Sequence, residues 1–289
     1  MGKTAGCKPI IAWVGGKRQL LSVINERLPQ HFNTYYEPFF GGGALFFDLC
    51  PPKAVVNDFN DQLVNMYEQI KTRPKEVKRY IDPLEEIYNG FSEETERAEF
   101  YYKLRDLFNG FILRKVHSPI SAATFIFLNK TGHCGLYRIN SKGEYNVSFG
   151  HKKQTNAYDE TNWQNVSKAL AGTKLLHGDF EKACADAKAG DFVFFDSPYY
   201  NTFDTYQKGG FSEHDHRRLA SLFRDLTDRG VYCMLTNSNT EFIKTLYSDF
   251  RVEVVDVKRM INRNANKRTD QEIIVTNYPV SAVGQSSAA

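Results

Sequence analysis

The length, composition and charge of the chain restrict the classes of protein to which it can belong. Its 289 residues are 42% hydrophobic with a formal net charge of +3, enough to bury one large core with or without an inserted part. No stretch reaches the run of about 18 apolar residues that a membrane helix needs, and the first residues lack an apolar signal region, so we expect a cytoplasmic protein. The five cysteines are scattered without a Cys-x-x-Cys pair, which indicates neither a zinc site nor a disulfide framework.

Apolar runs bounded by turn residues alternate with helical patterns along much of the chain. Strands are predicted over residues 35–37, 54–56, 174–176, 192–195, 231–235, 252–257 and 272–275. Helices are predicted over residues 17–28, 62–70 and 213–228, and another begins near Ala44. This alternation predicts an α/β fold with a mostly parallel, doubly wound sheet that carries helices on both faces.

The alternation breaks between residues 71 and 170. This stretch begins as charged helical sequence and continues into two β-like runs around Ser141-Lys142-Gly143, a favourable hairpin turn. We therefore expect an inserted second domain over residues 71–170 and a discontinuous main domain made of residues 1–70 and 171–280. Residues 281–289 are small and polar, which is typical of a disordered tail.

The most informative segment follows the apolar strand at 192–195 and reads Asp196-Ser197-Pro198-Tyr199. In an open α/β sheet, the carboxyl ends of the strands carry the chemistry. There a carboxylate accepts hydrogen bonds from an amino group, and a tyrosine ring stacks on a flat heterocycle. The segment therefore predicts a nucleobase site.

A glycine cluster, Glu37-Pro38-Phe39-Phe40-Gly41-Gly42-Gly43, lies between a strand and a helix. Glycines there allow a ligand to approach the backbone closely. Asp58 ends the second strand, at a place where an acid in a doubly wound fold binds ribose hydroxyls. Together they indicate a nucleoside-containing cofactor, and the alternative is a glycine-rich turn beside a strand-end aspartate.

Other polar residues surround this edge of the sheet. Trp13-Val-Gly-Gly-Lys17 lacks the full phosphate-loop spacing, so ATP hydrolysis is not expected; Lys17 could neutralise a ligand carboxylate, or be a surface lysine beside a core tryptophan. Asp179 ends another strand at the same edge. His214 and His216 are two apart at a helix start, which favours a solvated pair over a metal site.

Basic residues gather in two stretches near aromatic residues. Residues 129–153 contain Lys130, Arg138, Lys142, Lys152 and Lys153 against one glutamate, and residues 251–268 contain six basic residues against two acids. Either stretch is a candidate contact for a nucleic-acid backbone or an ordinary solvated surface.

Taken in order, these motifs resemble Dam-type adenine-specific DNA methyltransferases. The resemblance rests on Trp13 to Leu20, Tyr36 to Ala44, Asn57-Asp58, Gly178-Asp179-Phe180, Asp196 to Tyr199 and Gly135 to Asn140, and runs from Ala12 to Tyr278. It implies a Rossmann-like sheet that binds S-adenosylmethionine and needs no metal. It also implies double-stranded DNA as substrate, base flipping, and an inserted target-recognition domain of helices and a β-hairpin. The enzyme would be solitary or the partner of a separately acting restriction endonuclease.

The resemblance also implies roles for individual residues. Asp196, Ser197, Pro198 and Tyr199 match the catalytic motif. The implied cofactor contacts are Trp13, Lys17, Glu37, Phe39, Gly41, Gly43, Asp58, Asp179, Phe180 and Asp196. The implied DNA contacts are Lys130, Leu136, Arg138, Asn140 and Ser148, with Arg138 reading a guanine in the major groove.

The chain departs from the family pattern at two places. Ser197 replaces the usual proline, which keeps the backbone carbonyl but loses the stiffness of the proline ring. The hairpin has His133-Cys134 and Ser148 where GATC-recognising relatives differ, so GATC specificity is not implied. Alternative functions are methylation of the cytosine amino group, an RNA substrate, and a non-catalytic DNA-binding protein.

Overall fold

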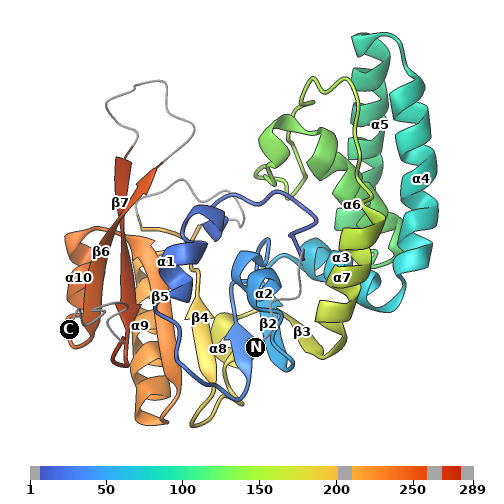
Figure 1. The fold of residues 1–289 in the computed structure, drawn as a ribbon. Coiled ribbons are helices and arrows are strands. Elements are labelled where there is room, and N and C mark those ends of the chain that lie inside the picture. Colours follow the sequence, from blue (N-terminus) through green and yellow to red (C-terminus); the bar gives the residue numbers. More distant parts are fainter. Residues whose placement is uncertain (1–6, 201–209, 259–268, 281–289) are drawn as a thin grey trace, which may run out of the picture.

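The computed structural model describes residues 7–200, 210–258 and 269–280. Within them, a seven-stranded sheet has the order β3-β2-β1-β4-β5-β7-β6 (Figure 1). β1 to β5 run parallel to one another, and β7 runs antiparallel between β5 and β6. The strands are β1 (Tyr35–Glu37), β2 (Ala54–Asp58), β3 (Thr173–His177), β4 (Phe192–Phe195), β5 (Tyr232–Ser238), β6 (Arg251–Lys258) and β7 (Thr269–Thr276). Each overlaps a predicted strand, and the α/β class is confirmed.

Helices cover both faces of the sheet, as predicted. Alternate residues of β4 point to opposite sides: Phe192 and Phe194 join one buried cluster, and Val193 and Phe195 join the other. The first cluster includes α2 (Ala44–Leu49) and α3 (Asp61–Thr72). The second includes α8 (Phe180–Ala183), α9 (Glu213–Asp228) and α10 (Glu241–Leu246).

The helix predicted over residues 17–28 is wrong in its extent. The segment forms a 3-10 turn over Lys17–Gln19 and a short helix α1 over Leu21–Asn25. The first turn is tied to the sheet edge, because the Lys17 ammonium donates to the Gly15 carbonyl and pairs with Asp196. At the other end, Pro29 disfavours helical geometry in the residue before it. A contact from a distant part of the chain and a following proline therefore override the apolar spacing.

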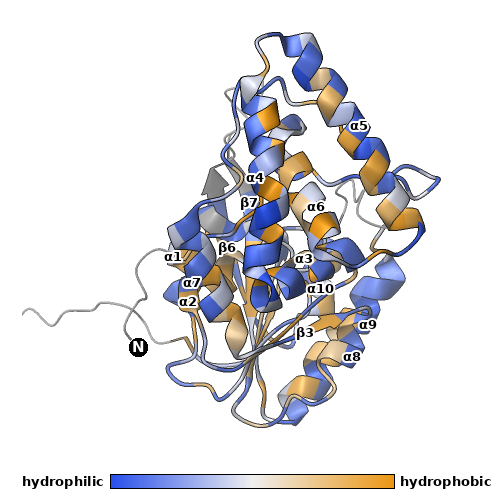
Figure 2. Ribbon diagram, turned by 90° about the vertical axis from the view of Figure 1, so that its right-hand side faces the viewer, coloured by the Kyte–Doolittle hydropathy of each residue, from blue (hydrophilic) through white to orange (hydrophobic). Residues whose placement is uncertain are grey.

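Residues 71–170 fold mainly as helices beside β2 and β3. They comprise α4 (Pro74–Gly90), α5 (Glu94–Leu113), α6 (Pro119–Thr131), a 3-10 turn at His133–Gly135 and most of α7 (Glu160–Ala171). In Figure 2, α4 and α5 mix hydrophilic and hydrophobic residues, as amphipathic helices do. α6 lies against both of them and against α3, with most of its residues buried. No described helix is long and apolar enough to cross a bilayer.

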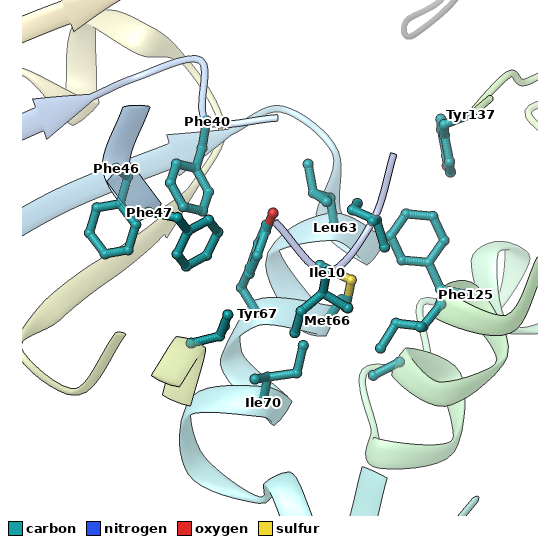
Figure 3. Packing of buried hydrophobic residues seen from close by; sticks show 14 of the residues in the cluster. Ile10, Phe40, Phe46, Phe47, Leu63, Met66, Tyr67, Ile70, Phe125 and Tyr137 are labelled. Atoms are coloured by element: carbon teal, nitrogen blue, oxygen red, sulfur yellow. The ribbon is translucent and has the colours of Figure 1, made fainter. Parts of the chain in front are cut away.

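One buried cluster continues from the sheet into this helical region. Figure 3 shows it running from Phe46 through Tyr67 and Met66 to Phe125 and Tyr137. The helical region is therefore held to the sheet by packing as well as by the chain connections. Since burying an aromatic or long aliphatic side chain contributes about 1.5–3 kcal/mol, this shared core favours a fixed relation between the two parts.

The hairpin around Ser141-Lys142-Gly143 forms, but as isolated bridges and not as two regular strands. Ile139 pairs with Tyr145, and Gly132 with Phe149. The Asn140 side-chain oxygen accepts hydrogen bonds from the backbone N–H groups of Lys142 and Glu144, which closes the turn. Residues 281–289, predicted to be a disordered tail, lie outside the described residues.

Candidate active site

A cavity of about 830 Å³ opens at the carboxyl ends of β1, β2 and β4. It brings together every residue that the sequence assigned to catalysis or cofactor binding. These are Trp13, Lys17, Glu37, Phe39, Gly41, Gly43, Asp58, Asp179, Phe180, Asp196, Ser197, Pro198 and Tyr199. Segments separated by more than half of the chain thus meet at one edge of the sheet, as the strand-end rule predicts.

The loop after β1 has a shape that only glycine adopts easily. Gly41 and Gly43 have φ of +48° and +63°. A Cβ on Gly41 would lie 2.7 Å from Trp13 Cδ1, and one on Gly43 would lie 2.7 Å from Phe40 Cζ. The loop therefore presents bare backbone to the cavity, with the Trp13 ring against it.

Asp58 anchors this loop. Its Oδ2 accepts a hydrogen bond from the Gly41 N–H at 2.8 Å, and its Oδ1 accepts one from the Asn60 N–H at 2.9 Å. Burial raises the pKa of Asp58, and these two hydrogen bonds oppose the rise. The Asp58 carboxylate thus lines the cavity and also holds the glycine loop in place. The second role was not predicted from the sequence.

Asp196, just beyond β4, forms a close ion pair with Lys17 in the cavity wall. Lys17 Nζ lies 2.6 Å from Asp196 Oδ1, with the side chains 5% and 19% exposed. Thr236 Oγ1 donates to the same oxygen at 3.1 Å, and Lys17 Nζ lies 4.5 Å from the centre of the Tyr199 ring. Burial raises the pKa of Asp196, and the Lys17 ammonium opposes the rise. A carboxylate, a cation and an aromatic face therefore share one corner.

Glu37 adds a second acid deeper in the cavity wall. Its side chain is buried and accepts a hydrogen bond from the Tyr35 hydroxyl at 2.8 Å. Burial raises the pKa of Glu37 well above its ordinary value, and the charges of Asp196 and Asp58 raise it further. Carboxyl groups from the ends of β1, β2 and β4 therefore line one cavity.

Three phenylalanine rings form an aromatic wall of the cavity. The Phe39 ring centre lies 5.3 Å from that of Phe180 and 5.7 Å from that of Phe211. Beside it, Arg218 pairs with Asp179 at 2.8 Å and lies over the Phe180 ring. Phe211 had not been identified from the sequence, where it stands in no motif. Such a wall accommodates a flat, apolar-faced group.

His216 does not belong to a solvated pair, so that prediction is wrong. Its side chain is buried against Phe211, 4.7 Å between ring centres, and burial lowers its pKa to about 4. His214 is exposed, as expected. Among the described residues, no cluster of three His, Cys, Asp or Glu side chains is arranged to hold a metal ion.

The residues assigned to DNA contact do not line this cavity; most of them belong to the hairpin region. Arg138 is exposed, and its guanidinium donates to the Asn146 side chain at 2.7 Å and to the Asn146 carbonyl at 3.1 Å. Ser148 is exposed, and Lys130 and Leu136 are half-buried. Asn140 is engaged in the turn. In the second basic stretch, residues 259–268 lie outside the described residues.

The hairpin nevertheless contacts the cavity through aromatic residues. Tyr137 stacks on Trp13 with ring centres 5.6 Å apart and planes at 26°. Asn129, buried at the end of α6, donates to the carbonyls of Ala12 and Gly135. The segment that carries Trp13 and Lys17 is thus bonded to the base of the hairpin.

Sequence reasoning missed the polar residues that support the corner from neighbouring strands. Thr236 and Asn237 lie on β5, and Glu272 lies on β7. Glu272 accepts a hydrogen bond from the Tyr199 hydroxyl, and Asn237 bonds Ser197. Their signal was weak: each belongs to a short polar run at a strand end, Thr236-Asn237-Ser238 in β5 and Thr269-Asp270-Gln271-Glu272 in β7. Such a run is informative only once the strand order is known.

Together, the fold and the cavity define an α/β protein with a carboxylate–tyrosine corner and a glycine loop at the carboxyl ends of its parallel strands. Comparison with known families identifies the class: residues 13–261 match the D12 class N6 adenine-specific DNA methyltransferases. The chain belongs to this family, and the resemblance inferred from its motifs is confirmed. It is an adenine-specific DNA methyltransferase with S-adenosylmethionine as methyl donor.

Relatives from different organisms are similar along almost their whole length. The type II methyltransferase M.MjaIII of Methanocaldococcus jannaschii is 41% identical over 94% of this chain and 99% of its own. The type II methyltransferase M1.LlaDCHI of Lactococcus lactis subsp. cremoris is 38% identical over 94% and 95%. The DNA adenine methylase of Escherichia coli K12 is 28% identical over 96% and 97%.

Proposed function

We propose that the corner Asp196-Ser197-Pro198-Tyr199 binds an adenine flipped out of duplex DNA and directs its N6 amino group at the methyl donor. The observation that carries this proposal is the position of Asp196, at the end of β4 in the same 830 Å³ cavity as the glycine loop and Lys17. The Asp196 carboxylate accepts one hydrogen bond from the amino group, and the carbonyl of residue 197 accepts the other.

These two acceptors change the nitrogen of the base. The lone pair of an exocyclic adenine nitrogen is delocalised into the ring, so the nitrogen is a poor nucleophile. Hydrogen bonds to two fixed acceptors favour a more tetrahedral nitrogen, whose lone pair points out of the ring plane. Holding the reactants in line contributes about 7–11 kcal/mol in well-oriented systems, so positioning can supply most of the acceleration.

The Tyr199 ring offsets part of the cost of flipping. Extruding a base costs a few kcal/mol, and stacking on an aromatic ring returns about 1–3 kcal/mol. Glu272 accepts a hydrogen bond from the Tyr199 hydroxyl, which fixes the outer end of the ring.

The other cavity residues fit S-adenosylmethionine, which when bound supplies a methyl group on a positively charged sulfur. Lys17 would neutralise the donor's carboxylate, and Glu37 would accept a hydrogen bond from its ammonium group. The bare backbone of Gly41 and Gly43 admits its methionine part, and Phe39, Phe180 and Asp179 border the part that carries the base. The cavity volume and the bare backbone of the glycine loop support this assignment.

Residues 71–170 are proposed to be the target-recognition domain. Arg138 is exposed at the hairpin, and a guanidinium matches the two acceptors on a guanine edge in the major groove. The neighbouring lysines of the 129–153 stretch would contact phosphates. The names of the relatives from M. jannaschii and L. lactis support a role as the modification partner of a separate restriction endonuclease.

Expression in a host without DNA methylation, followed by mapping of modified bases across its genome, tests this function. The wild type should place N6-methyladenine at one short sequence, and Asp196→Ala should leave the genome unmodified while its thermal unfolding remains cooperative. Asp186→Ala is the matched control, because Asp186 is exposed and pairs only loosely with Lys174 at 3.6 Å. Full methylation by Asp196→Ala would exclude Asp196 from the mechanism, and modified cytosines would favour the cytosine alternative.

A further inference from the structure

Asn237 is buried beneath the catalytic corner, and every polar atom of its side chain is used there. It lies on β5 and is 1% exposed. Its Nδ2 donates to Ser197 Oγ at 3.1 Å and lies 3.4 Å from the Pro198 carbonyl oxygen. Its Oδ1 accepts from the backbone N–H of Tyr200 at 3.1 Å. One side chain thus contacts both ends of the turn that carries Tyr199.

A neighbouring residue of β5 completes this support. The Ser238 N–H donates to Asn237 Oδ1 at 2.8 Å, which fixes the amide, and Ser238 Oγ donates to the Tyr200 carbonyl at 3.0 Å. Ser197 is itself buried, at 2% exposure. The Ser197 hydroxyl is therefore enclosed by protein, and its loss would remove a buried hydrogen bond that water cannot readily replace.

We propose that Asn237 is a positioning residue for methyl transfer and that it acts through the hydroxyl of Ser197, the two side chains forming one unit. This inference rests on the proposed function, in which the carbonyl of residue 197 accepts a hydrogen bond from the adenine amino group. The unit fixes the direction of that carbonyl. Asn237 itself touches neither adenine nor donor.

The physical reason lies in the residue at position 197. A proline there would lock φ near −65°, whereas serine leaves φ free to vary. A carbonyl that turns away from the amino group no longer completes the pair of acceptors. The Asn237–Ser197 bond ties the side chain of residue 197 to a central strand of the sheet and so limits this rotation from outside the backbone.

A positioning role for Asn237 and Ser197 predicts a lower kcat at unchanged affinities, which a purely structural hydrogen bond does not predict. Ser197→Ala deletes a single oxygen atom, with little risk to folding. We expect kcat for methyl transfer to fall about tenfold, the effect of losing a hydrogen bond worth about 1.4 kcal/mol in the transition state. The affinities for duplex DNA and for S-adenosylmethionine should stay unchanged, because neither is bound through this hydroxyl.

A double-mutant cycle tests whether Asn237 and Ser197 act as one unit or support the corner independently. Asn237→Ala should lower kcat at least as much as Ser197→Ala, and the double variant should be no slower than Asn237→Ala alone. If the side chains act independently, the losses multiply to about a hundredfold, and that result overturns the proposal. Asn239→Ala is the matched control, since its amide bonds Gln271 at 3.0 Å, away from the corner, and kcat should not change.

The outcomes also distinguish this inference from the function on which it rests. A wild type that transfers no methyl group to adenine refutes the proposed function. If the wild type is active and kcat is unchanged in Ser197→Ala, only the proposed positioning unit is refuted. The Ser197→Ala measurement tests the unit even if Asn237→Ala does not fold. A weakened DNA or donor affinity at unchanged kcat likewise overturns the inference.

Discussion

The substitution Lys17→Met tests the charge balance of the cavity. It removes the ammonium that lies 2.6 Å from Asp196 Oδ1, from a site where the two side chains are 5% and 19% exposed. Methionine retains a long, unbranched apolar stem, so the change is mainly one of charge. We predict that the variant folds but loses stability, and that the loss depends on pH.

The structure sets the size and the sign of that loss. Removing one partner of a buried ion pair costs about 3–5 kcal/mol. We expect the lower end, about 3 kcal/mol at neutral pH, because Asp196 keeps the hydrogen bond from Thr236 and some solvent contact. Burial already raises the pKa of Asp196, and without Lys17 the pKa rises further above its value in the unfolded chain. Stability then falls as pH rises, since the unfolded state releases the proton more readily.

Urea unfolding of the wild type and the variant between about pH 4 and about pH 8 measures this difference. The deficit of Lys17→Met should be smallest at the acid end, where Asp196 is largely protonated in the folded variant and about half protonated in the unfolded chain, and largest at neutral pH. Lys53→Met is the control, because Lys53 is exposed, and its stability should match the wild type throughout. A deficit that is constant over this range, or absent, would refute the claim that Lys17 stabilises the ionised form of Asp196.

Three further predictions concern other parts of the site. Glu37→Gln should raise the free energy of unfolding above about pH 4.3, the pKa of an unfolded glutamate, because burial raises the native pKa of Glu37 and its ionisation opposes folding. Calorimetry without the donor checks this, and a variant less stable than the wild type contradicts it. Gly41→Ala should weaken S-adenosylmethionine binding at least tenfold in titration calorimetry, since its Cβ meets Trp13 at 2.7 Å; unchanged affinity would place the donor elsewhere. Arg138→Ala should relax base preference at one position of the methylated sequence, by about 1–3 kcal/mol of discrimination, and unchanged site selection in genome-wide mapping argues against that role.

Much of the fold follows from local sequence. Each of the strands has enough apolar residues between turn signals to be recognised alone, and the strand-end rule then brings Asp58, Asp179 and Asp196 to one edge. The helix at residues 17–28 was wrong because its first residue is drawn to a carboxylate about 180 positions away. Apolar spacing contains no information about such a partner.

The sequence predicted the residues of the candidate site less completely than it predicted the fold. Asn237 and Glu272 reach the corner from β5 and β7, so their importance appears only with the order of the strands. His216 is different, because a signal was present: it shares helical spacing with Leu219 and Phe223 on the buried face of α9. Weighing that periodicity above the neighbouring charges would have predicted a buried imidazole.

A crystal structure with a duplex containing the methylated sequence and a donor analogue that cannot transfer its methyl group tests the central claim most directly. The target adenine should lie outside the helix with its ring on Tyr199 and its amino nitrogen within hydrogen-bond distance of the Asp196 carboxylate. The analogue should lie along Gly41. An adenine that remains stacked in the duplex, or an analogue bound away from Asp196, would contradict the account.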